Sequence, residues 1–158
     1  MTESLADRIM RQIHYASGLY YRLVLVVAQA GRGKTIALQE VRDRAGLPML
    51  NVNLELSRRM LDLTERQRVL QLPRLLAEIV NAAQADVNLL DNIEVLFDVA
   101  LKQDPLRLLQ GLARNKTVVA AWNGSIDHEY LAYATPDHPE YRRYSTRDFL
   151  AVTPEAIA

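Results

Sequence analysis

The hydrophobic and polar positions of this chain follow two patterns in turn, and their alternation predicts strands separated by helices. Runs of consecutive apolar residues are typical of strands buried on both faces of a parallel sheet. Such runs occupy residues 23–27, 49–54, 87–91, 117–122 and 149–152. Apolar residues at helical spacing occupy residues 1–17, 34–44, 75–80 and 105–114. This order predicts a three-layer α/β fold around a mainly parallel, five-stranded sheet.

Capping and turn residues set the expected ends of several elements. Thr2 or Ser4 is placed to cap the first helix. Asp104-Pro105 has the form of a cap followed by a first-turn proline, which starts the last helix. We expect Asn123-Gly124 to close the fourth strand as a turn. Residues 57–74 are expected to begin as a polar, arginine-rich connector.

The composition is typical of a globular protein and excludes several kinds of functional site. The chain has 158 residues, of which 49% are hydrophobic and 24% charged, and we expect one domain over residues 1–158 with its α/β core in 23–152. It has no cysteine, which excludes disulfides, thiolate metal sites and cysteine nucleophiles. The 19 basic and 19 acidic residues leave no net charge to attract nucleic acid or a membrane. Without a long apolar run or a signal sequence, we expect a cytoplasmic protein.

The segment after the first strand predicts a phosphate-binding loop. It reads Ala28-Gln29-Ala30-Gly31-Arg32-Gly33-Lys34-Thr35, which fits the broad form of the Walker A pattern, with Ala28 where the strict form has glycine. Small residues let backbone N–H groups surround phosphate oxygens at a helix N-terminus. We expect Lys34 to contact the β and γ phosphates and Thr35 to ligate Mg²⁺, with Ile36 completing the binding residues. The alternative is a glycine turn with a surface lysine.

Acidic residues near the ends of the next strands are candidates for metal binding and catalysis. Asp91 ends the third strand, where it would hold Mg²⁺ in a Walker B element or simply cap a helix. ATPases of the additional-strand class usually place glutamate next, but this chain has Asn92, which can orient water without accepting its proton. Glu94 and Glu55 are the candidates to replace that glutamate, although each also fits an ordinary surface or capping acid.

Two further residues have roles only beside a bound nucleotide. Asn123, at the end of the fourth strand, would sense the γ-phosphate, or it is simply a turn residue. Arg114, at the end of the preceding helix, would be an arginine finger for a neighbouring subunit, which requires a homo-oligomer. Its alternative is a cation beside a helix C-terminus.

Two basic segments raise the question of DNA binding. Residues 57–74 hold five arginines against two acids, beginning with Arg58 and Arg59. Arg142 and Arg143 form a second basic spot, flanked by tyrosines that can stack. Contact with DNA phosphates would use these four arginines. A solvated helix face explains the first segment equally well.

Four segments together resemble the small P-loop ATPase of phage-exclusion (BREX) defence systems. They are Gly31-Arg32-Gly33-Lys34-Thr35, Asn51-Val52-Asn53-Leu54-Glu55-Leu56-Ser57, Leu89-Leu90-Asp91-Asn92-Ile93-Glu94-Val95-Leu96-Phe97 and Ala121-Trp122-Asn123-Gly124. His138-Pro139-Glu140-Tyr141 is also similar to that family. The resemblance implies an AAA-like P-loop NTPase fold, ATP and Mg²⁺ as cofactors, and other BREX defence proteins as partners. AAA proteins carry a helical lid after this core, and we expect the chain to lack one.

Two functions of different classes follow. The first is an ATPase whose turnover drives assembly or remodelling of a bacterial anti-phage defence complex. The second is a nucleotide-gated binding module in which ATP orders residues 91–97 and so creates a surface for DNA or a larger protein, with little hydrolysis. Asn92 favours the second. A nucleotide kinase is a third interpretation, but the chain has no recognisable base-reading motif or lid.

Overall fold

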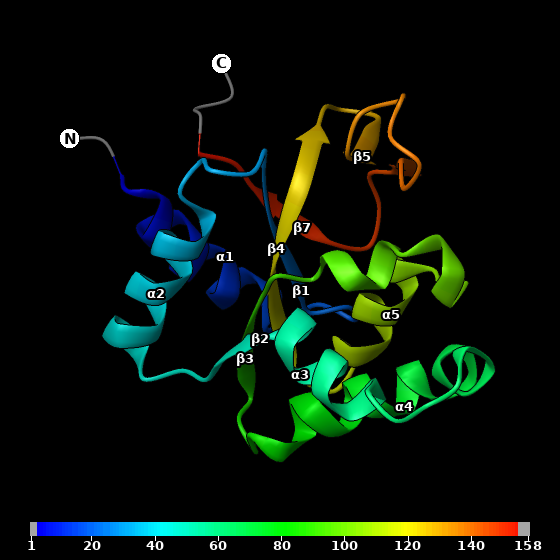
Figure 1. The fold of residues 1–158 in the computed structure, drawn as a ribbon. Helices are drawn as coiled ribbons and strands as arrows, with labels where there is room; N and C mark the ends of the chain where they lie inside the picture. The colour runs from blue at the N-terminus through cyan, green and yellow to red at the C-terminus, as the bar shows by residue number, and fades with distance from the viewer. Residues whose placement is uncertain (1–2, 155–158) are drawn as a thin grey trace.

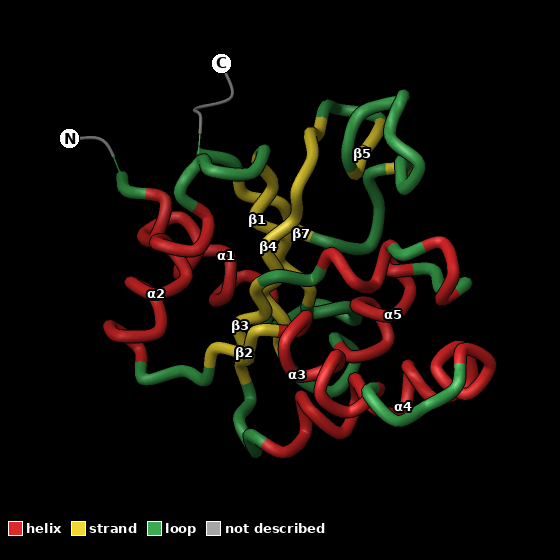
Figure 2. Tube along the Cα trace, viewed as in Figure 1, coloured by secondary structure: helices red, strands yellow, loops and turns green. Residues whose placement is uncertain are grey.

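The chain folds around a mainly parallel open sheet, with helices on both faces (Figures 1 and 2). This computed structural model describes residues 3–154. The parallel strands are β1 (Leu23–Ala28), β2 (Met49–Asn51), β3 (Val87–Asp91), β4 (Thr117–Ile126) and β7 (Leu150–Val152). Their order across the sheet is β2-β3-β4-β1-β7, which confirms the five parallel strands expected from the sequence.

Two helical layers enclose this sheet. One layer is α1 (Leu5–Ala16) and α2 (Lys34–Ala45), and the other is α3 (Val52–Met60), α4 (Glu65–Ala82) and α5 (Pro105–Leu112) (Figure 1). Val24 and Val26 of β1 pack into the core beneath the first layer, while Leu23 and Leu25 pack into the core beneath the second. No described helix is long and apolar enough to cross a membrane. All six residues of β1 are buried, because the strand lies between β4 and β7 and is covered by a helical layer on each face.

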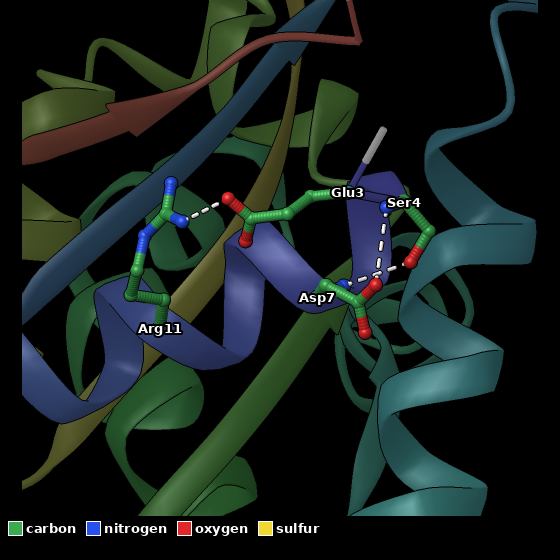
Figure 3. Close-up of polar contacts among 4 residues, drawn as sticks. All are labelled: Glu3, Ser4, Asp7 and Arg11. Atoms are coloured by element: carbon green, nitrogen blue, oxygen red, sulfur yellow. Dashed lines mark hydrogen bonds and ion pairs between the residues drawn. The ribbon is translucent and has the colours of Figure 1, made fainter. Parts of the chain in front are cut away.

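The first helix is fixed at its start by local hydrogen bonds. Ser4 Oγ accepts from the Asp7 backbone N–H at 3.0 Å, and the Ser4 N–H donates to the Asp7 carboxylate at 3.1 Å (Figure 3). This reciprocal pair is a capping box, which satisfies N–H groups that have no partner inside the helix. Arg11 donates to Glu3 across the next turns. Ser4 is therefore a cap as predicted, whereas Thr2 lies outside the described residues.

The second strand is shorter than the sequence pattern predicts. The expected strand 49–54 ends at Asn51, and α3 begins at Val52. The Asn51 side chain accepts a hydrogen bond from the Leu54 N–H at 3.0 Å, so it caps the new helix. The prediction that residues 57–74 begin as a connector is also wrong, because α3 and the first half of α4 occupy most of this segment. Apolar residues that the pattern assigned to a strand are instead on a short helix.

The fourth strand is longer than predicted. Asn123-Gly124 does not close it as a turn; β4 continues to Ile126 and pairs with β5 (Tyr130–Tyr133), which pairs with β6 (Arg142–Ser145). This antiparallel extension was not predicted, and it extends the sheet to seven strands. Figure 1 shows it beyond the helical layers, at the upper right. No helix follows β7 as far as residue 154.

A proline inside α4 leaves a carbonyl that a distant side chain satisfies. Pro73 has no N–H to donate to the carbonyl of Val69, four residues earlier. Gln103 Nε2 donates to that carbonyl at 2.9 Å and to the Leu101 carbonyl at 2.8 Å. Arg142 of β6 donates to the Gln103 carbonyl at 2.7 Å. Gln103 therefore links α4 and β6 to η2 (Val99–Leu101), the second of two short 3₁₀ helices, of which the first is η1 (Glu94–Phe97).

We expect Gln103→Ala to lower the free energy of unfolding by about 1–2 kcal/mol, because it leaves a part-buried carbonyl without a donor. In a Pro73→Ala background the cost should be smaller, since the alanine N–H can take over the Val69 carbonyl. Urea denaturation of the two single variants and the double variant measures the coupling. Additive losses would contradict this role for Gln103.

Candidate functional site

A glycine loop, residues 28–35, joins the carboxyl end of β1 to the start of α2. Gly31 has φ +80° and Gly33 has φ +86°, both in the left-handed region that favours glycine. Gly33 is also the N-cap residue of α2. The N–H groups of the first helical turn have no partners inside the helix, so the loop presents them at the positive end of the helix dipole.

Lys34 is buried within the loop, with 6% of the residue exposed. Its Nζ donates to the carbonyls of Ala28 and Gln29, each at 2.8 Å. Burial lowers the pKa of the Lys34 ammonium, while the nearby charges of Glu94 and Asp91 oppose that shift. The ammonium thus lies in a partly desolvated position where an anion would interact with it strongly.

Thr35 and Asp91 come together as the sequence predicts. Thr35 Oγ1 donates to the Asp91 carboxylate at 2.7 Å, and Asp91 is only 6% exposed at the end of β3. β4 lies between β1 and β3, so the glycine loop and Asp91 come from strands that are not direct neighbours. Parallel strands present their carboxyl ends at the same edge of the sheet, the edge where α/β proteins bind ligands.

Glu94 is held by two amide side chains. Asn123 Nδ2 donates to one carboxylate oxygen at 2.6 Å, and Asn53 Nδ2 donates to the other at 3.2 Å. Asn53 is itself fixed, because its side-chain oxygen accepts from the Val95 N–H at 2.8 Å and its own N–H donates to the Asn92 carbonyl at 2.9 Å. These contacts give the Glu94 carboxylate a fixed orientation. Asn53 is not among the residues predicted from the sequence, because the sequence pattern indicates a strand where α3 begins.

The glycine loop and these polar residues enclose one cavity of about 300 Å³. Its lining residues are Ala30, Gly31, Gly33, Lys34, Thr35, Ile36, Asp91, Asn92, Glu94 and Asn123. They include one buried cation, two carboxylates and two amides. The lining can therefore bind an anionic group at the loop and orient a water molecule at Glu94.

Other predicted loop residues have smaller parts in this cavity. Ala28 and Gln29 contribute carbonyls to Lys34 rather than lining the cavity. Arg32 is exposed and does not line it. Ile36 lines it although the residue is 71% exposed. Most of the predicted binding residues thus surround the cavity, and Arg32 lies outside it.

Two catalytic candidates lie away from the cavity within this chain. Glu55 is on α3, not at a strand end, where it faces Arg58 at 3.8 Å. Arg114 precedes β4, at the amino edge of the sheet, and its guanidinium lies 4.8 Å from the Tyr20 ring centroid. β1 alone separates the two edges by about 20 Å. Arg114 therefore cannot reach the cavity of its own chain.

The four arginines predicted to contact DNA differ in their exposure and in what they contact within the chain. Arg142 is bound to the Gln103 carbonyl, and the Arg143 guanidinium lies 4.2 Å from the Tyr130 ring centroid. Arg58 and Arg59 are exposed on α3 instead. Tyr144 is one of the tyrosines of the second segment that were expected to stack on a base. Its hydroxyl donates a hydrogen bond to the Asp104 carboxylate at 3.2 Å, so it already has a partner within the chain.

A scan of the sequence against protein-family models finds no match, and a search of curated proteins finds none either. The fold and cavity define the chain as an α/β protein with a glycine loop at the carboxyl edge of a mostly parallel sheet.

Proposed function

We propose that this protein is a P-loop NTPase that binds ATP with Mg²⁺ at the glycine loop and hydrolyses it. The observation that carries the proposal is the hydrogen bond between Thr35 and Asp91 beside the buried Lys34. A hydroxyl from the first turn of α2 and a carboxylate from the end of β3 meet next to a cation at a helix N-terminus. That combination suits a phosphate chain with a bound divalent cation.

The magnesium ligands in this proposal are Thr35 and Asp91. Mg²⁺ prefers oxygen ligands and is usually held by one or two protein groups, substrate phosphates and several waters. In the described part of the chain, no cluster of three or more histidine or acidic residues could hold a metal by itself. The pair therefore fits a metal that arrives with a nucleotide better than a permanently bound ion.

The remaining polar residues divide the chemistry of hydrolysis. Lys34 stabilises negative charge on the β and γ phosphates. Glu94, oriented by two amides, accepts a proton from the attacking water. The water oxygen bonds to the γ-phosphorus while the bond between that phosphorus and the leaving ADP oxygen breaks. Asn123, which already contacts Glu94, couples the carboxylate to the position of the γ-phosphate. Asn92 is then not required as a base.

Partners enter the proposal from the resemblance to the BREX P-loop ATPases. On that basis the protein acts with larger defence proteins against phage. In a homo-oligomer, Arg114 would act on a neighbour's nucleotide, since it is remote from the cavity of its own chain. DNA contact is proposed for Arg59 and for Arg58, which are both exposed although Arg58 faces Glu55, ahead of Arg142 and Arg143, whose guanidinium groups contact the Gln103 carbonyl and the Tyr130 ring.

Asn92 supports a second candidate function, a nucleotide-gated binding module with little hydrolysis. This residue, placed directly after Asp91, has φ +52° and cannot act as a base. The short helices η1 and η2 follow it at once. Nucleotide binding would then change the arrangement of this segment and the surface that it presents, rather than drive a cycle of hydrolysis.

Equilibrium binding of fluorescent ATP with Mg²⁺ tests the proposal. Lys34→Ala should weaken binding by roughly 10- to 100-fold, because a hydrogen bond to a charged group contributes about 1.5–3 kcal/mol. Lys116→Ala, at the opposite edge of the sheet, is the matched control and should bind as the wild type does. Phosphate release in the same samples separates the ATPase from the binding module. Failure of the wild type to bind at millimolar nucleotide would refute both.

A further inference from the structure

A second cavity lies between α4 and η2, on the side of the sheet that α3, α4 and α5 cover (Figure 1). It has a volume of about 530 Å³ and is lined by Glu65, Arg66, Val69, Leu70, Ala100 and Lys102. None of these residues lines the cavity at the glycine loop. We name it the α4–η2 groove. Its walls are joined by Gln103, which bonds the Val69 carbonyl that Pro73 leaves free.

The surface of the groove combines exposed aliphatic side chains with positive charge. Leu70 is 71% exposed, and Val99, next to the lining residue Ala100, is 61% exposed. Arg66 and Lys102 are exposed lining residues, and neither is in an ion pair among the described residues. Glu65 is the single acidic lining residue. Apolar surface flanked by unpaired cations is typical of a protein contact.

The walls also restrict the conformation of what can bind. The walls are an α-helix, α4, and a single 3₁₀ turn, η2, and neither is a strand with an unpaired edge. The groove thus has no strand edge to which an extended peptide could add. An incoming chain must satisfy its own backbone, which a helix does.

We propose that the α4–η2 groove binds an acidic amphipathic helix of a partner protein. Apolar residues of that helix would cover Leu70 and Val99, and its carboxylates would pair with Arg66 and Lys102. This surface is separate from the nucleotide cavity. The inference therefore does not depend on the proposed ATP chemistry.

Fluorescence anisotropy with the full chain tests this surface. The probe is a labelled synthetic peptide of about 15 residues with leucine at helical spacing and glutamate between, and a second peptide has lysine in place of each glutamate. We expect the wild type to bind the acidic peptide and not the basic one. Leu70→Asp should weaken binding at least about 10-fold, since it places a charge at the apolar contact. Tyr15→Asp, an exposed change on α1, is the control and should have no effect.

Charge reversal supplies the decisive comparison. Arg66→Glu combined with Lys102→Glu should transfer the preference from the acidic to the basic peptide, a result that unfolding cannot mimic. Absence of acidic-peptide binding, or equal binding by all groove variants, would overturn the proposal. So would binding of a short DNA duplex in place of the peptide. Lys34→Ala should bind the peptide as the wild type does. Loss of nucleotide binding in this variant would therefore not affect the test of the groove.

Discussion

Gly124→Ala should lower the free energy of unfolding by about 3 kcal/mol or more, a large part of the 5–15 kcal/mol typical of a domain. A Cβ atom at Gly124 would lie 1.8 Å from the backbone oxygen of Ala132. That oxygen belongs to the paired strand β5, so it cannot rotate away as a side chain can. The same oxygen accepts from Trp122 Nε1 at 3.1 Å. Displacing it also leaves the indole N–H of a buried tryptophan without its acceptor.

Urea denaturation followed by tryptophan fluorescence measures this loss. Gly111→Ala is the matched control, since nothing lies within 4 Å of the new Cβ and the position is inside α5. There, alanine should stabilise the protein by about 0.5–1 kcal/mol through helix propensity. Equal stability of Gly124→Ala and the wild type would show that the antiparallel extension is not packed as described.

Glu94→Gln should slow phosphate release by 100-fold or more while leaving nucleotide affinity within a few-fold of the wild type. Glutamine keeps the size of the side chain and one carbonyl oxygen for Asn123 or Asn53, but it cannot accept a proton from water. General base catalysis typically contributes 10²- to 10⁴-fold. Single-turnover phosphate release and fluorescent-ATP binding, made on the same preparation, separate the two effects.

Glu55→Gln is the control for this experiment. It removes a carboxylate that faces Arg58 on α3 and does not line the cavity, so phosphate release should be unchanged. If Glu94→Gln releases phosphate as fast as the wild type, Glu94 is not the base. If the wild type binds nucleotide without releasing phosphate, the binding module becomes the better proposal.

The sequence predicts the parallel core well because its strands are buried on both faces. Val24 and Leu25 illustrate why: a run that packs against helices on each side must be apolar throughout, and few other structures need such a run. The glycine loop is predictable for a different reason. Gly31 and Gly33 occupy backbone conformations that other residues rarely adopt, so the residue types of the motif themselves indicate the shape of the loop.

The parts that were not predicted depend on contacts between distant residues. Residues 52–54 could equally continue the strand, and the bond from the Leu54 N–H to the Asn51 side chain marks the start of a helix instead. Gly124 has the residue type of a turn, but its small size serves the approach of β5. Asn53 reaches Glu94, 41 positions later, through a fold that places the starts of α3 and η1 together. No local pattern contains that contact.

The full burial of β1 also bears on how often the segments around the glycine loop open to solvent. β1 is hydrogen-bonded to β4 on one side and β7 on the other, so we expect its amide protons to exchange with solvent mainly when the whole fold opens. Across the cavity, Glu94 begins η1, which is a single short 3₁₀ turn. We expect such a turn to open by local fluctuations more often than β1 does. The cavity thus joins the slowest-opening part of the chain to faster ones, and the faster side is the one able to respond to a bound ligand.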